Sequence, residues 1–247
     1  APMVDQSDLP FRLLCRNYGT NLCFTPMIHA KMFSQKEGYR KKFWSYVNGT
    51  PPEDRPLIVQ ICGSDTAAVI YTIRYILSSK GSVDGFDLNC GCPQSIAKRG
   101  NYGAFLLEKD DGKVIVDLVK DLVKEVGKEI PISVKVRILP TGVEDSLKLY
   151  KRLVDAGASM LTIHGRNRMQ KGLQTGKADW GAIKRVVELF GDKIPIMANG
   201  GISNLDDVRE CLDYTGVDGI MSSEAILEYP ALFTDTNTEA VGGKRTG

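Results

Sequence analysis

The residues best suited to chemistry lie in one short loop, Asp87-Leu-Asn-Cys-Gly-Cys-Pro93. One residue separates its two cysteines, which is not the usual zinc spacing, and the chain has only two histidines to complete a site. A Cys-x-x-Cys redox pair does not occur. One reactive thiol remains, Cys92, which could act as an acid or a nucleophile. The alternative is an inert thiol buried in a turn at a strand end. We expect no metal site.

Two cations share one face of the strand predicted over Ile132–Ile138. Alternation along a strand places Lys135 and Arg137 on the same side, opposite the valines between them. Cations that point into an enclosed site are costly unless an anion lies there, and a reduced flavin ring or a phosphate would serve. A pair of cations at a frayed strand end is the alternative.

One of the two histidines, His164, ends an apolar run and is followed by Gly165 and Arg166. A histidine on an apolar strand is usually structural. Its place at the C-terminal end of the strand favours a functional role, because barrel enzymes carry their chemistry there.

A glycine pair suggests a phosphate site. Asn199-Gly200-Gly201 ends one predicted strand and leads into a helix, and Met221-Ser-Ser-Glu224 ends the next. Glycines let the backbone approach a ligand closely, and a helix N-terminus favours an anion. The alternative is a tight turn between strand and helix.

Alternating strands and helices must position these residues. The strand candidates are Asn21–Pro26, Leu57–Ile61, Gly85–Asn89, Ile132–Ile138, Met160–His164, Pro195–Asn199 and Asp218–Ser222. The helix candidates are Leu9–Asn17, Ser34–Val47, Thr66–Ser78, Asp111–Val126, Val143–Ala156, Trp180–Phe190 and Asn204–Tyr214. We expect Ser203 with Asp206 to form a capping box and Gly157 to end a helix. The alternation implies parallel strands with right-handed crossovers.

A TIM (β/α)8 barrel and an open doubly wound sheet both fit this alternation. No G-x-G-x-x-G follows the early strands, which favours the barrel. The first helix has no strand before it, so Ala1-Pro-Met3 would be the end of a first strand that is mostly lacking. Seven predicted strands and this remnant make eight.

Composition fits one soluble domain over residues 1–233. The chain has 247 residues, 43 % of them hydrophobic, and a net charge of only +2, which does not itself indicate nucleic-acid binding. Residues 234–247 are polar, and we expect a disordered tail. Six cysteines without a signal peptide indicate a reducing compartment. No apolar run reaches the ~20 residues of a membrane helix. We expect a monomer in the cytoplasm or nucleus, with no membrane partner.

The chain resembles the tRNA-dihydrouridine synthase family, FMN-binding TIM barrels that reduce the 5,6 double bond of uridine. The resemblance runs from Ala1 to about Phe233. Two stretches, 91–105 and 221–233, resemble the eukaryotic members that act at D-loop positions 16 and 17. The carrying motifs are Ala1-Pro-Met-Val-Asp5 with Pro10-Phe-Arg12, Val59-Gln60, Asn89-x-Gly91-Cys92-Pro93, Val134-Lys-Val-Arg137, His164-Gly-Arg166 and Ala198-Asn-Gly200.

The resemblance implies FMN as cofactor, NADPH or NADH as reductant, and tRNA as partner. It implies that Cys92 is catalytic and protonates uracil C5 while flavin N5 gives hydride to C6. It implies that Asn89, Arg137 and Arg166 bind the substrate, with Asn89 orienting a flipped uracil. The implied cofactor-binding residues are Pro2, Met3, Val4 and Gln60 at the ring, Lys135 at its N1/O2 edge, His164 against the flavin, and Asn199, Gly200, Gly201, Ser223 and Glu224 at the phosphate.

Cations follow three of the predicted strands, and we interpret them as RNA contacts rather than solvated loop charges. They are Lys36, Arg40, Lys41, Lys42, Lys98, Arg99, Arg166, Arg168, Lys171 and Lys177.

The chain departs from the family pattern in three respects. Most of the first strand is lacking, the family's C-terminal helical domain is not seen after Phe233, and Asn167 stands where the family usually has threonine. The family motifs make a uridine reductase the leading hypothesis. Because of these departures, the alternative is a truncated, non-catalytic remnant that binds FMN or tRNA without turnover. A third hypothesis is another FMN barrel that reduces a small enone, against which the pair of Asn89 and Cys92 argues.

Overall fold

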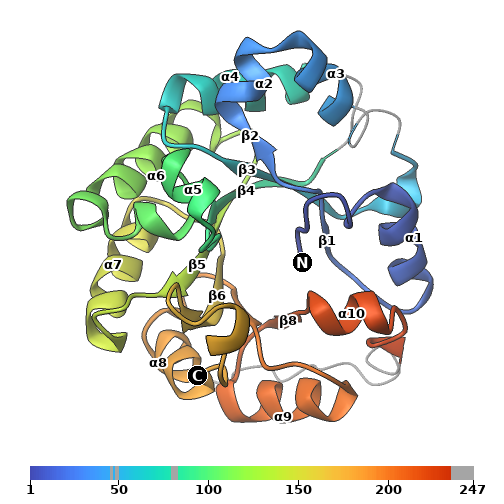
Figure 1. Ribbon diagram of the computed structural model, residues 1–247, viewed down its shortest axis with the longest axis vertical. Coiled ribbons are helices and arrows are strands. Elements are labelled where there is room, and N and C mark those ends of the chain that lie inside the picture. The colour runs from blue at the N-terminus through green and yellow to red at the C-terminus, as the bar shows by residue number, and fades with distance from the viewer. Residues whose placement is uncertain (45–46, 48–49, 79–82, 235–247) are drawn as a thin grey trace.

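The computed structural model describes residues 1–44, 47, 50–78 and 83–234, and its strands form one parallel sheet that curls into a barrel (Figure 1). The helices lie outside the ring of strands, which confirms the predicted α/β barrel class. The strands are β1 Cys23–Phe24, β2 Ile28–His29, β3 Leu57–Cys62, β4 Gly85–Cys90, β5 Ile132–Ile138, β6 Leu161–Asn167, β7 Ile196–Asn199 and β8 Gly219–Met221.

Ten α-helices and four short 3-10 helices are present among the described residues. The α-helices are α1 Leu9–Asn17, α2 Ala30–Gln35, α3 Glu37–Trp44, α4 Thr66–Leu77, α5 Ser95–Arg99, α6 Lys113–Val126, α7 Val143–Asp155, α8 Trp180–Phe190, α9 Leu205–Thr215 and α10 Glu224–Glu228. The 3-10 helices are η1 Pro52–Asp54, η2 Gly103–Leu106, η3 Lys109–Gly112 and η4 Gly172–Gln174.

Burial explains both patterns in the sequence. Every residue of β3 is buried, as expected for a strand between a barrel interior and a covering helix. α6 buries Ile115, Leu118, Val119, Leu122 and Val126, which recur at helical spacing. The apolar runs therefore became strands and the periodic runs became helices.

Two predictions about helices were wrong. The helix expected over Ser34–Val47 is two helices, α2 and α3, that break at an extended Lys36. Arg40 stabilises this break by donating hydrogen bonds to the carbonyls of Phe33 and Ser34. The capping box lies one residue later than expected, because Asn204 is the extended residue and exchanges hydrogen bonds with Asp207.

The barrel has one position without a paired strand. β1 and β2 both pair with β3, so these two short strands occupy one strand position of the sheet. Within the described residues, no strand pairs with both β1 and β8 to close the ring. The N-terminus lies in this gap, where the Ala1 amine donates a hydrogen bond of 2.8 Å to the Ser222 carbonyl (Figure 1). A cavity of about 460 Å³ opens beside it, between Phe24 and Ile220. The expected polar tail lies, except for Thr234, outside the described residues.

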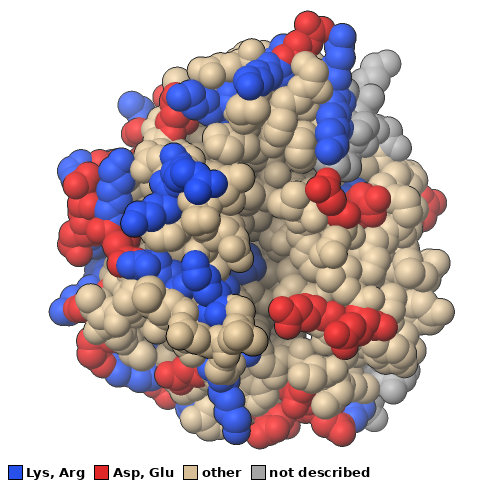
Figure 2. Space-filling model, viewed as in Figure 1, with Lys and Arg blue, Asp and Glu red and all other residues tan. Residues whose placement is uncertain are grey.

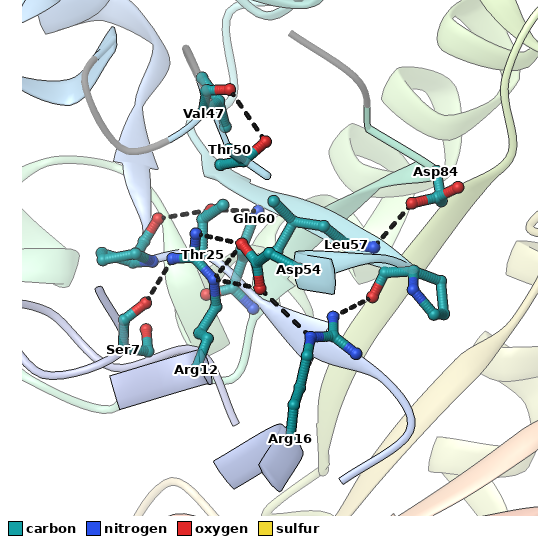
Figure 3. A network of polar contacts seen from close by, with 12 residues as sticks. Ser7, Arg12, Arg16, Thr25, Val47, Thr50, Asp54, Leu57, Gln60 and Asp84 are labelled. Carbon is teal, nitrogen blue, oxygen red and sulfur yellow. Dashed lines mark hydrogen bonds and ion pairs between the residues drawn. The ribbon is translucent and has the colours of Figure 1, made fainter. Parts of the chain in front are cut away.

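A buried ion pair anchors α1 to the barrel (Figure 3). The Arg12 guanidinium donates to both carboxylate oxygens of Asp54 at 2.6 to 3.2 Å, and the side chains are 2 % and 0 % exposed. Arg12 also donates to the Ser7 carbonyl at 2.8 Å, and the Ser7 hydroxyl binds the Met3 backbone. Arg12 therefore positions the N-terminal segment, a role that its motif alone did not reveal.

Candidate active site

The register of the sheet brings the polar strand ends to one level. Asn89 pairs with Lys135, Arg137 pairs with His164, and His164 pairs with Asn199. The C-terminal ends of parallel strands meet at one mouth of a barrel. The structure therefore brings these polar residues together at the barrel mouth.

The Cys92 loop is fixed by its backbone. The Asn89 Oδ1 accepts hydrogen bonds from the Gly91 N–H at 3.2 Å and the Cys92 N–H at 3.0 Å. Arg137 Nε donates to the Gly91 carbonyl at 2.7 Å. Gly103 packs from the other side with φ of +72°, where an added Cβ would lie 2.5 Å from the Cys92 carbonyl oxygen. The loop therefore requires a glycine at position 103.

The thiol of Cys92 is the accessible one. Cys92 is partly exposed, whereas the other five cysteines are buried. Burial raises the pKa of the Cys90 thiol well above its ordinary value, so that neighbour is inert. Burial thus favours Cys92 over Cys90 as the reactive thiol, the same residue that the sequence indicated.

Lys135 is a cation held against a neutral acceptor. Its Nζ donates to the Asn199 Oδ1 at 2.7 Å, and the Asn199 Nδ2 donates to the Met221 carbonyl at 2.9 Å, which fixes that amide. Burial, and then the charge of Arg137, lower the pKa of Lys135 to about 8, although the Asp87 carboxylate acts in the opposite direction. The amine thus remains largely charged near pH 7 and would gain from a bound anion.

His164 is neutral. Burial, followed by the charges of Lys135, Arg137 and Arg166, lowers its pKa to about 2. Arg166 Nη1 lies 3.3 Å from His164 Nε2. Since a guanidinium can only donate, Nε2 is the acceptor and the ring proton lies on Nδ1. His164 can therefore offer one N–H without adding charge.

A cavity of about 270 Å³ opens between the ends of β5, β6, β7 and β8. Gly200 has φ of +97°, and an added Cβ would lie 2.9 Å from the His164 ring. The buried hydroxyl of Ser222 has no hydrogen-bond partner among the described residues. The lining includes Arg137, His164, Arg166, Asn199, Gly200, Gly201, Ser222, Ser223 and Glu224. Two guanidinium groups, an unpartnered hydroxyl and a glycine cradle fit a phosphate.

The remaining predicted residues lie elsewhere around the mouth. Pro2 and Met3 are partly buried in the N-terminal segment, and Val4 is 52 % exposed. Gln60 is fully buried beneath Asn89, to which its Oε1 is bound at 2.8 Å. None of these four lines the 270 Å³ cavity, so their predicted contacts with the flavin ring remain predictions.

Sequence reasoning missed two contributors. Trp180 Nε1 donates to the Gly200 carbonyl at 3.1 Å and so holds the glycine turn. Asp87 lies under Asn89 on the same strand face. The i, i+2 spacing from Asn89 was the available signal for Asp87, whereas nothing local marks Trp180.

Charge divides the face around the mouth into two sides (Figure 2). Lys and Arg gather over α5 and the loop after β6, whereas Asp and Glu gather beside α10 and the N-terminal segment. Several predicted RNA-contacting cations have partners in the chain. Lys171 donates to the Pro93 carbonyl at 3.1 Å, and Arg168 pairs with Glu108. Lys98 and Arg99 are exposed on α5.

Two kinds of feature are absent from the described residues, a metal-binding cluster and a membrane-spanning helix. Within residues 1–44, 47, 50–78 and 83–234, no group of three His, Cys, Asp or Glu side chains could hold a metal ion. No helix in the same part of the chain has the length and apolar character to cross a membrane.

The fold and the cavity define a parallel α/β barrel with an arginine-lined cavity at the C-terminal ends of its strands. Solved structures share this fold: a 2-naphthoyl-CoA reductase complex superposes with a TM-score of 0.71 at 12 % identity, covering 95 % of this chain and 47 % of that chain. Histamine dehydrogenase from Rhizobium sp. 4-9 superposes with a TM-score of 0.65 at 11 % identity, covering 94 % of this chain and 43 % of that chain. A profile of the dihydrouridine synthase (Dus) family matches residues 1–245, and the chain belongs to this family.

Two relatives are similar over nearly the whole chain. A tRNA-dihydrouridine(16/17) synthase-like protein of Rattus norvegicus, whose name carries NAD(P)(+), is 43 % identical over 233 residues, which are 94 % of this chain and 50 % of that one. The tRNA-dihydrouridine(16/17) synthase of Saccharomyces cerevisiae is 41 % identical over 239 residues, which are 97 % of this chain and 54 % of that one. The chain spans about half the length of these curated relatives.

Proposed function

We propose that this chain reduces uridine to 5,6-dihydrouridine in the D loop of tRNA, with FMN as cofactor and NADPH or NADH as reductant. One observation carries the proposal. The accessible thiol of Cys92 lies in a loop fixed by Asn89 and Arg137, and Arg137 also lines the cationic cavity. Family membership and the names of the relatives support the same reaction.

The cavity supports FMN through its phosphate. Arg166, which the resemblance assigned to the substrate, lines this cavity and would instead bind the phosphate. The backbone around Gly200, Gly201, Ser223 and Glu224 would hold that group as well, and the unpartnered Ser222 hydroxyl would donate to it. Neutral His164 on β6 lines the same cavity, and Lys135 lies on the neighbouring strand β5, where both would face the ring. When bound, FMN supplies the hydride that reduces the double bond.

Cys92 would supply the proton. Reduction of a carbon–carbon double bond needs a proton at the second carbon, and a positioned acid lowers that barrier. The Cys92 backbone is held at its N–H by Asn89 and at its carbonyl by the Ala104 N–H at 3.0 Å. These bonds restrict where the thiol can point, which is what delivery to uracil C5 requires.

The RNA would approach from the cationic side of the mouth. Exposed Lys98 and Arg99 lie on α5, which follows the Cys92 loop directly. A base must leave the RNA stack to reach a site at the barrel mouth, and phosphate contacts beside the opening would offset part of that cost. Arg137 and Asn89 would then contact the base.

The test follows the flavin spectrum of the purified, FMN-loaded chain without oxygen. NADPH should bleach the flavin, and tRNA lacking dihydrouridine should restore its absorbance. Cys92→Ala should still be bleached but should lose reoxidation by tRNA by about a hundredfold or more. Cys90→Ala is the matched control, since that thiol is buried two residues earlier, at the end of β4.

The alternative of a non-catalytic remnant predicts a different pattern. Such a chain would bind FMN or tRNA, yet tRNA would not reoxidise the reduced flavin. Failure to bind FMN would contradict the proposed function, and failure to bind either FMN or tRNA would contradict both hypotheses.

A further inference from the structure

Asp87 is a fully buried carboxylate with no assigned role. It lies on β4, two residues before Asn89, and is 0 % exposed. Its Oδ2 accepts a hydrogen bond from Gln60 Nε2 at 2.7 Å, and its Oδ1 accepts one from the Ser133 hydroxyl at 2.7 Å. A buried carboxylate is costly, so it persists only where its hydrogen bonds and neighbouring charges compensate.

These bonds continue as a chain to the Cys92 loop. Gln60 Oε1 accepts from Asn89 Nδ2 at 2.8 Å. The Asn89 Oδ1 in turn accepts from the N–H groups of Gly91 and Cys92. An unbroken path of side-chain hydrogen bonds thus connects a buried charge to the backbone of the proposed proton donor.

The direction of this path is determined by its two ends. An ionised carboxylate can only accept, and backbone N–H groups can only donate. Both ends therefore impose the same orientation on the amides of Gln60 and Asn89. Both acceptor positions of the Asn89 oxygen are used inside the chain, and one Nδ2 hydrogen has no partner among the described residues.

We propose that Asp87 is a positioning residue that locks the Gln60 and Asn89 amides in one orientation, so that Asn89 presents only a hydrogen-bond donor to a bound base. This rests on the proposed function. A donor placed at the uracil O4 favours uracil, because cytosine carries a donor amino group at that position. The path would therefore help to select uracil over cytosine.

The protonation of Asp87 agrees with this role. Burial raises its pKa to about 6, opposed by the hydrogen bonds from Gln60 and Ser133 and by the charge of Lys135. The carboxylate is ionised at neutral pH and acts as the acceptor that the path requires. Of the groups around it, Lys135 is the cation and Cys90 is a neutral thiol.

The path can be reversed by exchanging its two ends. In Asn89→Asp, the Gln60 Oε1 faces a carboxylate oxygen of residue 89, and both atoms are acceptors. The Gln60 amide cannot turn to donate instead, because Asp87 holds its Nε2. In the double variant Asp87→Asn/Asn89→Asp, residue 87 donates to Gln60, Gln60 donates to residue 89, and residue 89 still accepts from the loop. Asp87→Asn alone should be mild, because the Ser133 hydroxyl can accept instead of donating.

Hydrogen exchange of the Gly91 and Cys92 amides, followed by NMR on the full chain, measures this directly. We expect exchange to accelerate about tenfold in Asn89→Asp and to return to within about twofold of the unaltered rate in the double variant. Uridine reduction should stay lost in the double variant, because residue 89 then offers only acceptors. A double variant that exchanges as fast as Asn89→Asp would overturn the proposal, and so would one that regains activity.

Two further outcomes are informative. If Asn89→Asp does not fold, a double variant that does fold supports the exchange of ends, and one that does not fold contradicts it. The exchange rates need no activity. Hence a chain without uridine reduction that shows the expected rates would refute the proposed function and leave the positioning role intact.

Discussion

Two clusters of buried cations in this barrel are satisfied in different ways. Arg12, on α1, is bound to the Asp54 carboxylate, which also accepts from Arg16 (Figure 3). At the barrel mouth, by contrast, Lys135 and Arg137 donate only to neutral oxygens, those of Asn199, Gly91 and Asn167. The first cluster is bound directly to a carboxylate, whereas the Asp87 carboxylate acts on Lys135 through its charge and is hydrogen-bonded to Gln60 and Ser133 instead.

This difference separates a structural charge from a functional one. A buried ion pair with good geometry is self-contained, and its loss leaves an uncompensated charge. Buried cations without a bound carboxylate are instead poised for an anion, and their lowered pKa values record the cost of keeping them. Breaking each cluster should therefore affect different properties.

The largest effect on stability is expected at the structural pair. Asp54→Ala leaves Arg12 and Arg16 without their counter-charge and should lower the free energy of unfolding by about 3–5 kcal/mol. Urea denaturation followed by circular dichroism measures this. A loss below about 1 kcal/mol would contradict the assignment of Arg12 as a structural anchor.

Removing a mouth cation should leave stability unchanged and weaken anion binding. Arg166→Gln should reduce FMN affinity about tenfold or more, the usual value of a charge-assisted hydrogen bond, without lowering the unfolding midpoint. Riboflavin, which lacks the phosphate, is the matched ligand. Its affinity should change little, and an equal loss for both flavins would place Arg166 away from the phosphate.

Lys135 gives the comparison a pH dependence. Its pKa is about 8 in the folded chain and 10.5 in the reference state, so the unfolded chain binds more protons between these values. Stability should therefore rise with pH across this window. Thermal melts of the unaltered chain and Lys135→Met should diverge there, with the variant lacking that rise. Parallel curves would show that the amine is not desolvated.

The smallest effect is expected at an exposed pair. Glu144 and Arg185 form an ion pair with side chains 68 % and 47 % exposed. Glu144→Gln should change the free energy of unfolding by less than about 1 kcal/mol. A loss as large as that of Asp54→Ala would mean that burial is not what distinguishes these pairs.

The sequence predicted elements whose signals are local. Leu9–Asn17 and Trp180–Phe190 agree with the structure residue by residue, since proline near the start of α1 and Asp179 before α8 mark where these helices begin. The break at Lys36 depends on Arg40 reaching back to Phe33 and Ser34, and no spacing rule contains that contact.

The residues of the candidate site also fall into those with local sequence signals and those that act through distant partners. Strand alternation and strand ends identified Lys135, His164 and Asn199, because the barrel mouth collects every strand end. Asp87 and Trp180 act through partners 27 and 20 residues away in sequence, so the folded chain is needed to identify those partners.

The most direct test of uridine reduction is the product itself. The chain is incubated with FMN, NADPH and tRNA lacking dihydrouridine, and the nucleosides are quantified by mass spectrometry. We predict dihydrouridine from the unaltered chain and from Cys90→Ala, with a loss of about a hundredfold or more in Cys92→Ala. No dihydrouridine from the unaltered, FMN-loaded chain, or equal amounts from Cys92→Ala, would contradict the account.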